Sequence, residues 1–203
     1  MSEPTRSQRL SVQEYLDMEM ASPIRHEYVN GQVFAMSGAS KSHNRICLNL
    51  SGLIEEHLDG TSCSVYVVDL KLRIEKADCF YYPDLMVTCE PFDADQYVIT
   101  EPVLIIEVLS PSTRQTDLRE KLAAYKSIHT VKQYVIIYQD RMRIELHQRV
   151  NQEQWDAIIL HRLANLELTC CPGKSLNIPV ERIYKGLDLP PVVREEEGEY
   201  EIV

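Results

Sequence analysis

Apolar and polar residues alternate along this chain with clear periods. In residues 40–58, SKSHNRICLNLSGLIEEHL, apolar positions return every three or four residues, which predicts an amphipathic helix. Residues 64–75, SVYVVDLKLRIE, alternate instead and predict one half-exposed strand. Residues 103–110, VLIIEVLS, are almost continuously apolar, which is typical of a strand covered on both faces.

Shorter signals fill in the rest of the chain. Ser11 and Glu14 form a capping-box pattern that predicts a short helix, and Asn30-Gly31 between two β-prone runs predicts a hairpin. Further strands are expected in CFYYPDLMVTC (79–89), VKQYVIIYQ (131–139) and RIELHQR (143–149), with a helix over 117–128 and short strands with a last helical turn after 149. This order predicts an α/β fold in which a mixed central β-sheet is flanked by helices.

Composition suggests one domain and a separate tail. The 203 residues are 44% hydrophobic and 26% charged, which suffices for one core. We expect a single domain over residues 1–190 and an acidic tail over 191–203, of a composition typical of disordered segments. The net charge of −10 disfavours nucleic acid as a partner, but residues 114–149 carry eight Lys and Arg against four Asp and Glu. A local basic face can therefore coexist with an acidic chain.

The cysteines and the N-terminus bear on the compartment. The six cysteines show neither a C-x-x-C pair nor zinc-finger spacing, so free thiols are expected. The first ten residues, MSEPTRSQRL, lack the apolar core of a signal peptide, and no run reaches the roughly 18 apolar residues of a membrane span. These features predict a cytoplasmic protein without a membrane anchor.

Two acids lie within β-prone apolar segments, Asp84 in YYPDLMV and Glu107 in LIIEVLS. A buried carboxylate costs several kcal/mol unless it is paired, hydrogen-bonded or bound to a metal. Acids on adjacent strands, about 4.8 Å apart, can converge on one hard cation such as Mg²⁺. The alternative is that Glu107 pairs with a buried arginine and Asp84 caps a turn. The chain has neither a G-x-x-x-x-G-K phosphate loop nor a G-x-S-x-G nucleophile elbow.

Longer motifs around these acids point to a family. EYVNGQVFAMSGAS followed by His43, YYPDLMV, PVLIIEVLSPSTRQTDLREKLAAYKSI and VKQYVIIY together resemble the Uma-two family of restriction endonucleases, within the PD-(D/E)XK nuclease superfamily. The resemblance covers about residues 10 to 150. It implies a restriction-endonuclease-like fold and a Mg²⁺-dependent endonuclease acting on DNA, with Mn²⁺ as a possible substitute. Asp84, Glu107 and the main-chain carbonyl of Val108 would then hold the metal.

The sequence departs from the superfamily pattern at one position. A plain E-x-K motif would place a lysine at position 109, where this chain has Leu109. In the Uma-two pattern the lysine moves into the following helix, and Lys121 matches that position. It would steady the attacking water or offset charge on the phosphate. The alternative is a solvated helix lysine, although Lys121 adjoins the apolar stripe of Leu118, Leu122 and Tyr125.

Other residues are weaker candidates. By the resemblance, Glu27 is a further catalytic or metal-side acid and His43 a phosphate contact or proton-transfer group; the alternatives are a strand-edge acid and a polar surface histidine. Asp69 in VYVVDLKL is a possible buried acid, and Asp117 is expected to cap its helix. The candidate phosphate contacts, each alternatively an ordinary surface charge, are Lys71, Arg73 and Arg114.

Two functional hypotheses therefore stand. The first is a metal-dependent endodeoxyribonuclease, most simply a homodimer because duplex DNA has pseudo-two-fold symmetry. The second is a nuclease fold kept as a catalytically inactive binding or assembly module, which the acidic charge and Leu109 favour. Divalent-ion binding should separate them, because a ligand of the folded state raises its stability.

Overall fold

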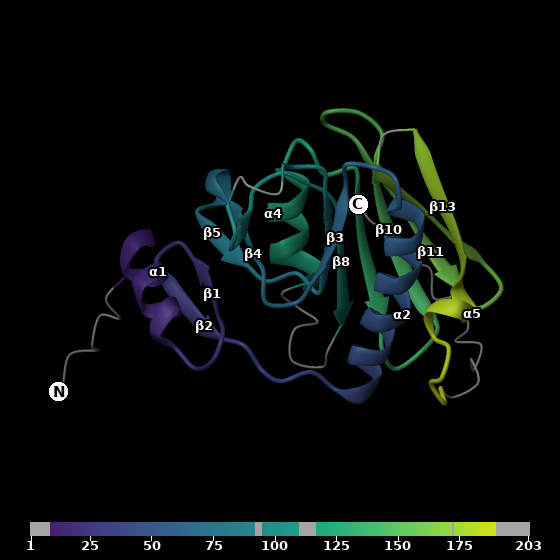
Figure 1. Cartoon of the computed structure of the whole chain (residues 1–203), viewed down its shortest axis with the longest axis horizontal. Coiled ribbons are helices and arrows are strands. Elements are labelled where there is room, and N and C mark those ends of the chain that lie inside the picture. The colour runs from purple at the N-terminus through teal and green to yellow at the C-terminus, as the bar shows by residue number, and fades with distance from the viewer. Residues whose placement is uncertain (1–8, 92–94, 110–116, 172, 190–203) are drawn as a thin grey trace.

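The described residues form two mixed sheets, a separate antiparallel hairpin and covering helices (Figure 1). The computed structural model describes residues 9–91, 95–109, 117–171 and 173–189. In chain order the elements are α1 (Val12–Ala21), β1 (His26–Val29), β2 (Gln32–Ala35), α2 (Lys41–Leu58), β3 (Ser64–Val67), β4 (Lys71–Ile74), the 3-10 turn η1 (Glu75–Ala77), β5 (Cys79–Tyr81), β6 (Leu85–Thr88), β7 (Val98–Ile99), β8 (Pro102–Leu109), the π-helical η2 (Asp117–Lys121), α4 (Leu122–Lys126), β9 (Gln133–Tyr138), β10 (Arg143–Arg149), β11 (Trp155–His161), β12 (Asn165–Cys171), β13 (Lys174–Pro179) and α5 (Val180–Ile183). The predicted α/β class is confirmed, with more than one sheet in place of a single central one.

The N-terminal part forms a five-stranded sheet in the order β2-β1-β5-β4-β7, with α1 beside it. The capping box is present, since the Ser11 main-chain N–H donates to Glu14 Oε2 at 2.7 Å. The predicted hairpin is also present: Val29 faces Gln32, and Asn30 and Gly31 take positive φ values of 49° and 86°. Both local predictions are confirmed.

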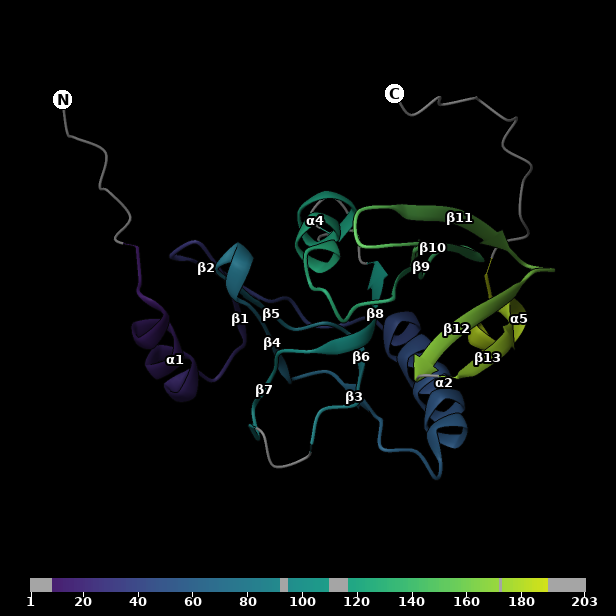
Figure 2. The same cartoon turned by 90° about the horizontal axis from the view of Figure 1, so that it is seen from above.

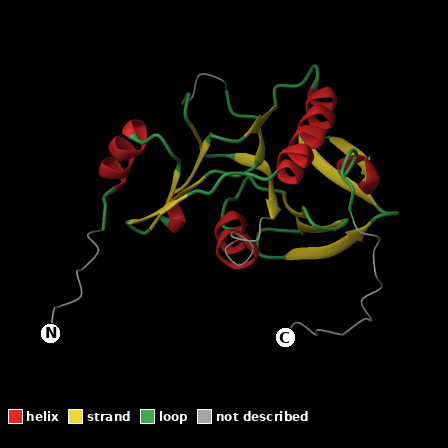
Figure 3. Ribbon diagram, turned by 90° about the horizontal axis from the view of Figure 1, so that it is seen from below, coloured by secondary structure: helices red, strands yellow, loops and turns green. Residues whose placement is uncertain are grey.

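The second sheet, in the order β11-β10-β9-β8-β6-β3, carries the main core. Strand β8 lies inside it, antiparallel to β6 and parallel to β9. Its side chains alternate between two apolar layers, with Leu104 and Ile106 packing on the α2 side and Ile105 and Leu109 on the α4 side. The two helices therefore cover opposite faces of this sheet, as Figures 2 and 3 show. The expectation of a strand buried on both faces is confirmed.

The predicted strand over residues 64–75 is in fact two strands in different sheets. β3 pairs with β6 in the six-stranded sheet, whereas β4 pairs with β5 in the other. Between them Val68 and Asp69 adopt left-handed conformations with φ of 44° and 61°, and the Val68 N–H donates to the Asp84 carbonyl at 3.1 Å. Alternation alone did not mark this break, because neither glycine nor proline stands at it.

The segment over residues 79–89 is divided in the same way, into β5 and β6. The division falls at Tyr82, Pro83 and Asp84, where proline cannot donate a ladder hydrogen bond. The chain thus leaves the six-stranded sheet between β3 and β4 and re-enters it between β5 and β6, and Asp84 lies at this re-entry. This junction places an acid at the end of β6 instead of within a continuous strand.

The cysteine prediction is wrong for one pair. Cys63 and Cys89 form a disulfide that links the segment before β3 to the end of β6, its pairing partner. The other four, Cys47, Cys79, Cys170 and Cys171, are free and buried, as expected. The spacing of Cys63 and Cys89 in the sequence gave no indication of the disulfide, because the antiparallel register of β3 and β6 brings the two cysteines together. Among the described residues no helix combines the length and apolar character needed to cross a membrane.

Candidate functional site

The first predicted acid, Asp84, is fixed to the strand that carries the second. The register of β6 and β8 sets Leu85 opposite Ile106, so Asp84 enters the sheet beside Glu107. Asp84 Oδ2 accepts a hydrogen bond from the Val108 main-chain N–H at 2.7 Å. The two acids are therefore neighbours across adjacent strands, as the sequence predicted.

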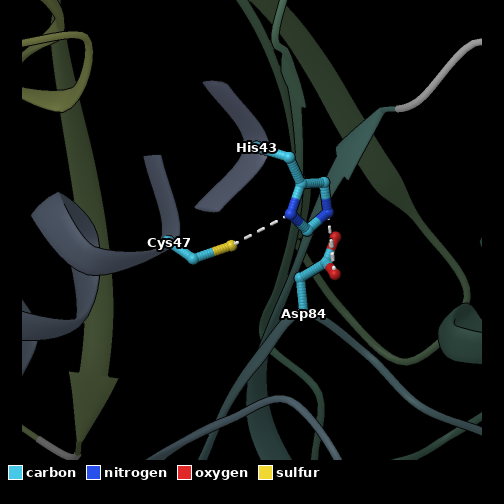
Figure 4. A group of neighbouring side chains, drawn as sticks. All are labelled: His43, Cys47 and Asp84. Atoms are coloured by element: carbon cyan, nitrogen blue, oxygen red, sulfur yellow. Dashed lines mark hydrogen bonds and ion pairs between the residues drawn. The ribbon is translucent and has the colours of Figure 1, made fainter. Parts of the chain in front are cut away.

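His43 approaches Asp84 from the first turn of α2. Ser40 caps this helix, its hydroxyl accepting from the His43 N–H at 3.1 Å. His43 Nε2 lies 3.0 Å from Asp84 Oδ1, and the residue is only 8% exposed. Figure 4 shows the imidazole pointing at the carboxylate. The alternative of a solvated surface histidine is therefore wrong.

Glu107 lies among groups from the α4 side of the sheet. Its Oε1 is 3.2 Å from Lys121 Nζ and accepts a hydrogen bond from the Tyr125 hydroxyl at 2.7 Å. Burial, reinforced by the charge of Glu107, raises the pKa of Tyr125 well above its ordinary value, so this phenol remains a donor. Glu107 and Lys121 are 3% and 4% exposed. The alternative of a solvated lysine at position 121 is wrong.

Glu27 completes the group from β1 of the other sheet. Its Oε1 lies 2.8 Å from Lys121 Nζ, so the ammonium is held by Glu27 and Glu107 together. The same ammonium lies 5.4 Å from the centre of the Tyr81 ring. The structure thus brings the five predicted side chains, Glu27, His43, Asp84, Glu107 and Lys121, to the junction of the two sheets.

The charges of this group do not balance. Glu27, Asp84 and Glu107 supply three carboxylates, against Lys121 and, when it is protonated, His43. At least one negative charge in excess remains among these side chains, in a region largely removed from water. Oxygen donors with excess negative charge are what hard divalent cations require. Carboxylate oxygens of this kind suit Mg²⁺ or Mn²⁺; that Asp84, Glu107 and the Val108 carbonyl are the ligands stays a prediction.

Asp69 is not part of the group, contrary to its predicted burial. Its side chain is 69% exposed and its nearest cation is Arg25, at 3.5 Å. The left-handed backbone at Asp69 turns it out to solvent between β3 and β4.

Two of the other basic candidates, Lys71 and Arg73, contact residues outside the group. Lys71 lies over the rings of Tyr82 and Tyr97, and Arg73 pairs with Asp78 at 3.0 Å. Arg114 lies outside the described residues, as does the side chain of Asp117, so its predicted capping role stays a prediction. Within the basic segment, Arg143 pairs with Glu145, and Arg149 donates to main-chain carbonyls including that of Ile128 at 2.7 Å. Part of the positive charge of that segment is therefore engaged in ion pairs and hydrogen bonds within the protein.

Two residues of the group were not assigned roles from the sequence. Tyr125 was seen only as part of an apolar stripe, although it lies four residues after Lys121 on the same helical segment. Cys47 lies four residues after His43 on α2, with its Sγ 3.8 Å from His43 Nδ1. Burial, and then the charges of Asp84 and Glu107, raise the pKa of the Cys47 thiol. In both cases the spacing of four residues, which places two side chains on the same face of a helix, could have indicated the contact.

Clustered acids and one buried lysine thus lie at the junction of the two sheets. The fold agrees with a crystal structure from Anabaena variabilis described as a "putative nuclease belonging to DUF820". That chain superposes with a TM-score of 0.68 at 16% identity, over 86% of this chain and 97% of the other. The likeness establishes the fold.

Sequence relationships identify the family. Residues 12–180 match the profile of the Uma2 family, described as "Putative restriction endonuclease". Two proteins of Synechocystis sp., both described as "Uncharacterized protein", are similar over most of their length. The first, slr1290, is 36% identical over 88% of this chain and 93% of its own, and sll1609 is 34% identical over 72% and 84%. The chain belongs to the Uma2 family.

Proposed function

We propose that this protein is a divalent-metal-dependent endonuclease that hydrolyses phosphodiester bonds of DNA. The observation that carries the proposal is the position of Lys121, which is buried and lies 3.2 Å from Glu107 although it comes from a different element. A helix lysine thereby takes the place that Leu109 leaves vacant in the E-x-K pattern.

Each side chain of the group then has a defined task. Asp84 and Glu107 would hold the cation, Mg²⁺ or Mn²⁺, which when bound would lower the pKa of water and offset charge on the phosphate. Lys121 positions the attacking water and stabilises the added negative charge. The water loses one proton to solvent as its oxygen bonds to phosphorus, the phosphorus–ester oxygen bond breaks, and the leaving oxygen takes a proton from solvent. Glu27 orients the ammonium of Lys121, and His43 orients Asp84.

In this proposal, exposed basic residues that do not take part in the fold's own ion pairs contact the DNA backbone. Arg119, two residues before Lys121, and Lys132, just before β9, are both exposed. They suit salt-dependent phosphate contacts that fix the strand without reading its sequence. Two chains related by a two-fold axis would address both strands of a duplex.

Cleavage of supercoiled plasmid by the purified protein tests the proposal. We expect nicking or linearisation in Mg²⁺ that stops with a chelator. Asp84→Asn and Glu107→Gln should each lower the rate at least about a hundredfold, whereas the exposed acids Asp156→Asn and Glu167→Gln serve as matched controls and keep it. Full activity in either site variant would remove that residue from the proposal.

The inactive binding module remains the second candidate, and the His43–Asp84 contact favours it, since the histidine already occupies Asp84 Oδ1. Thermal unfolding with added Mg²⁺ or Mn²⁺ separates the two. A nuclease should gain about 2.7 kcal/mol at a cation concentration of 100 times the Kd. An inactive module should show no gain, and the gain should vanish in an Asp84→Asn, Glu107→Gln double variant.

A further inference from the structure

A histidine, a cysteine and an aspartate converge on the α2 side of the six-stranded sheet. His43 and Cys47 stand one turn apart on α2, and Asp84 comes from the entry to β6. One ligand atom from each residue lies within 4.8 Å of the other two. Figure 4 shows the imidazole between the thiol and the carboxylate, with one ring nitrogen facing each.

The three side chains lie near enough to one another for one ion to reach all of them. The Cys47 Sγ is 3.8 Å from His43 Nδ1, and His43 Nε2 is 3.0 Å from Asp84 Oδ1. A tetrahedral ion with ligand bonds of about 2.0 to 2.3 Å separates its ligand atoms by roughly 3.5 Å. The two contacts use different ring nitrogens, and one ion binds only one of them. Because one ligand atom from each residue lies within 4.8 Å of the other two, the imidazole must turn and the donors move closer by up to about 1.3 Å to share one ion.

The donor types select the ion. A thiolate and an imidazole favour borderline ions such as Zn²⁺, whereas Mg²⁺ requires oxygen ligands and does not compete for sulfur. The negative charges of Asp84 and Glu107 beside the cysteine add attraction for any cation. Cys47 is 3% exposed, so the thiol is shielded from reagents in solution, whereas the Asp84 side chain is 15% exposed.

We propose that His43, Cys47 and Asp84 form a binding site for a divalent transition-metal ion of the Zn²⁺ class. The thiol proton passes to solvent when the sulfur–metal bond forms. This site is different from the hard-cation site of Asp84 and Glu107, and it does not depend on the proposed nuclease activity. Because Asp84 belongs to both, the two ions compete for one carboxylate, and a Zn²⁺-class ion opposes Mg²⁺ binding.

Co²⁺ titration of the full chain is the direct test, since a cobalt–thiolate bond gives a sulfur-to-metal charge-transfer band. The protein is used with the Cys63–Cys89 disulfide intact and without thiol reductants, so that the free cysteines are the only thiols offered to the ion. We expect a band that saturates at one ion per chain and is lost when Zn²⁺ is added. Cys47→Ala should abolish the band, and His43→Gln should weaken Co²⁺ binding more than about a hundredfold, beyond the loss typical of an outer-shell partner.

The matched control is Cys170→Ala, which removes a buried free thiol of β12 and should leave the band unchanged. The proposal is overturned if the unmodified protein shows no band, or if the band survives Cys47→Ala. Thermal unfolding verifies that each variant is folded, and if Cys47→Ala does not fold, an unweakened Co²⁺ affinity in His43→Gln overturns it instead. Plasmid cleavage in Mg²⁺ is measured separately, so loss of cleavage with an intact band counts only against the nuclease proposal.

Discussion

Replacing Lys121 by methionine removes one positive charge while keeping most of the aliphatic volume. Its ammonium lies 2.8 Å from Glu27 and 3.2 Å from Glu107, and the three side chains are at most 15% exposed. Removing one partner of a buried ion pair costs about 3–5 kcal/mol, because the remaining charge is left uncompensated. We therefore expect Lys121→Met to lower the free energy of unfolding by that amount in the absence of divalent ions.

Chemical denaturation of the metal-free protein measures this cost. The exposed Lys174→Met is the matched control and should change stability by less than about 0.5 kcal/mol. Adding Glu27→Gln to Lys121→Met should restore about 1–2 kcal/mol, because one of the two uncompensated carboxylates becomes neutral. A loss below about 1 kcal/mol for Lys121→Met, or further loss in the double variant, would refute the electrostatic account of the site.

Two further predictions concern stability away from the site. Burial, and then the charge of Lys126, lower the pKa of His147 to about 4. Because this pKa is lower in the folded than in the unfolded state, the free energy of unfolding should fall as the pH drops from about 6.5 to 4. Denaturation across this range should show about 2 kcal/mol more loss than in His147→Phe, and equal losses would contradict the assignment. Gly31→Ala should cost more than Gly186→Ala, since both have φ near +85° but only at Gly31 would the new Cβ lie 2.7 Å from the Arg9 Cβ. Equal losses of stability in the two variants, measured by thermal unfolding, would show that the Arg9 side chain moves aside without an energetic penalty.

Sequence patterns over a few residues correctly predicted the helices and turns that depend mainly on interactions between neighbouring residues. The Asn30-Gly31 hairpin and the helix capped by Ser40 follow from turn chemistry and from periodicity, and both are present. The neighbourhood of Asp84 and Glu107 also followed, because each acid interrupted an apolar run and adjacent strands were the natural way to join them. A buried charge is informative in sequence because its cost demands a partner.

What the sequence did not show depends on contacts between distant segments. The alternating pattern of residues 64–75 cannot reveal that Val68 and Asp69 turn the chain from one sheet into the other. The partners of Lys121 come from β1 and β8, so Glu27 could be placed beside it only once both sheets were assembled. Cys63 and Cys89 likewise meet through strand register.

The central claim is that the acids at the sheet junction support metal-dependent hydrolysis of DNA. Single-turnover cleavage of a labelled duplex, with protein in excess and Mg²⁺ varied, tests it most directly. The account predicts a rate that rises with Mg²⁺ and saturates in the unmodified protein, and that falls at least about a hundredfold in folded Glu107→Gln. Cleavage that is independent of Mg²⁺, or equal in Glu107→Gln, would contradict it.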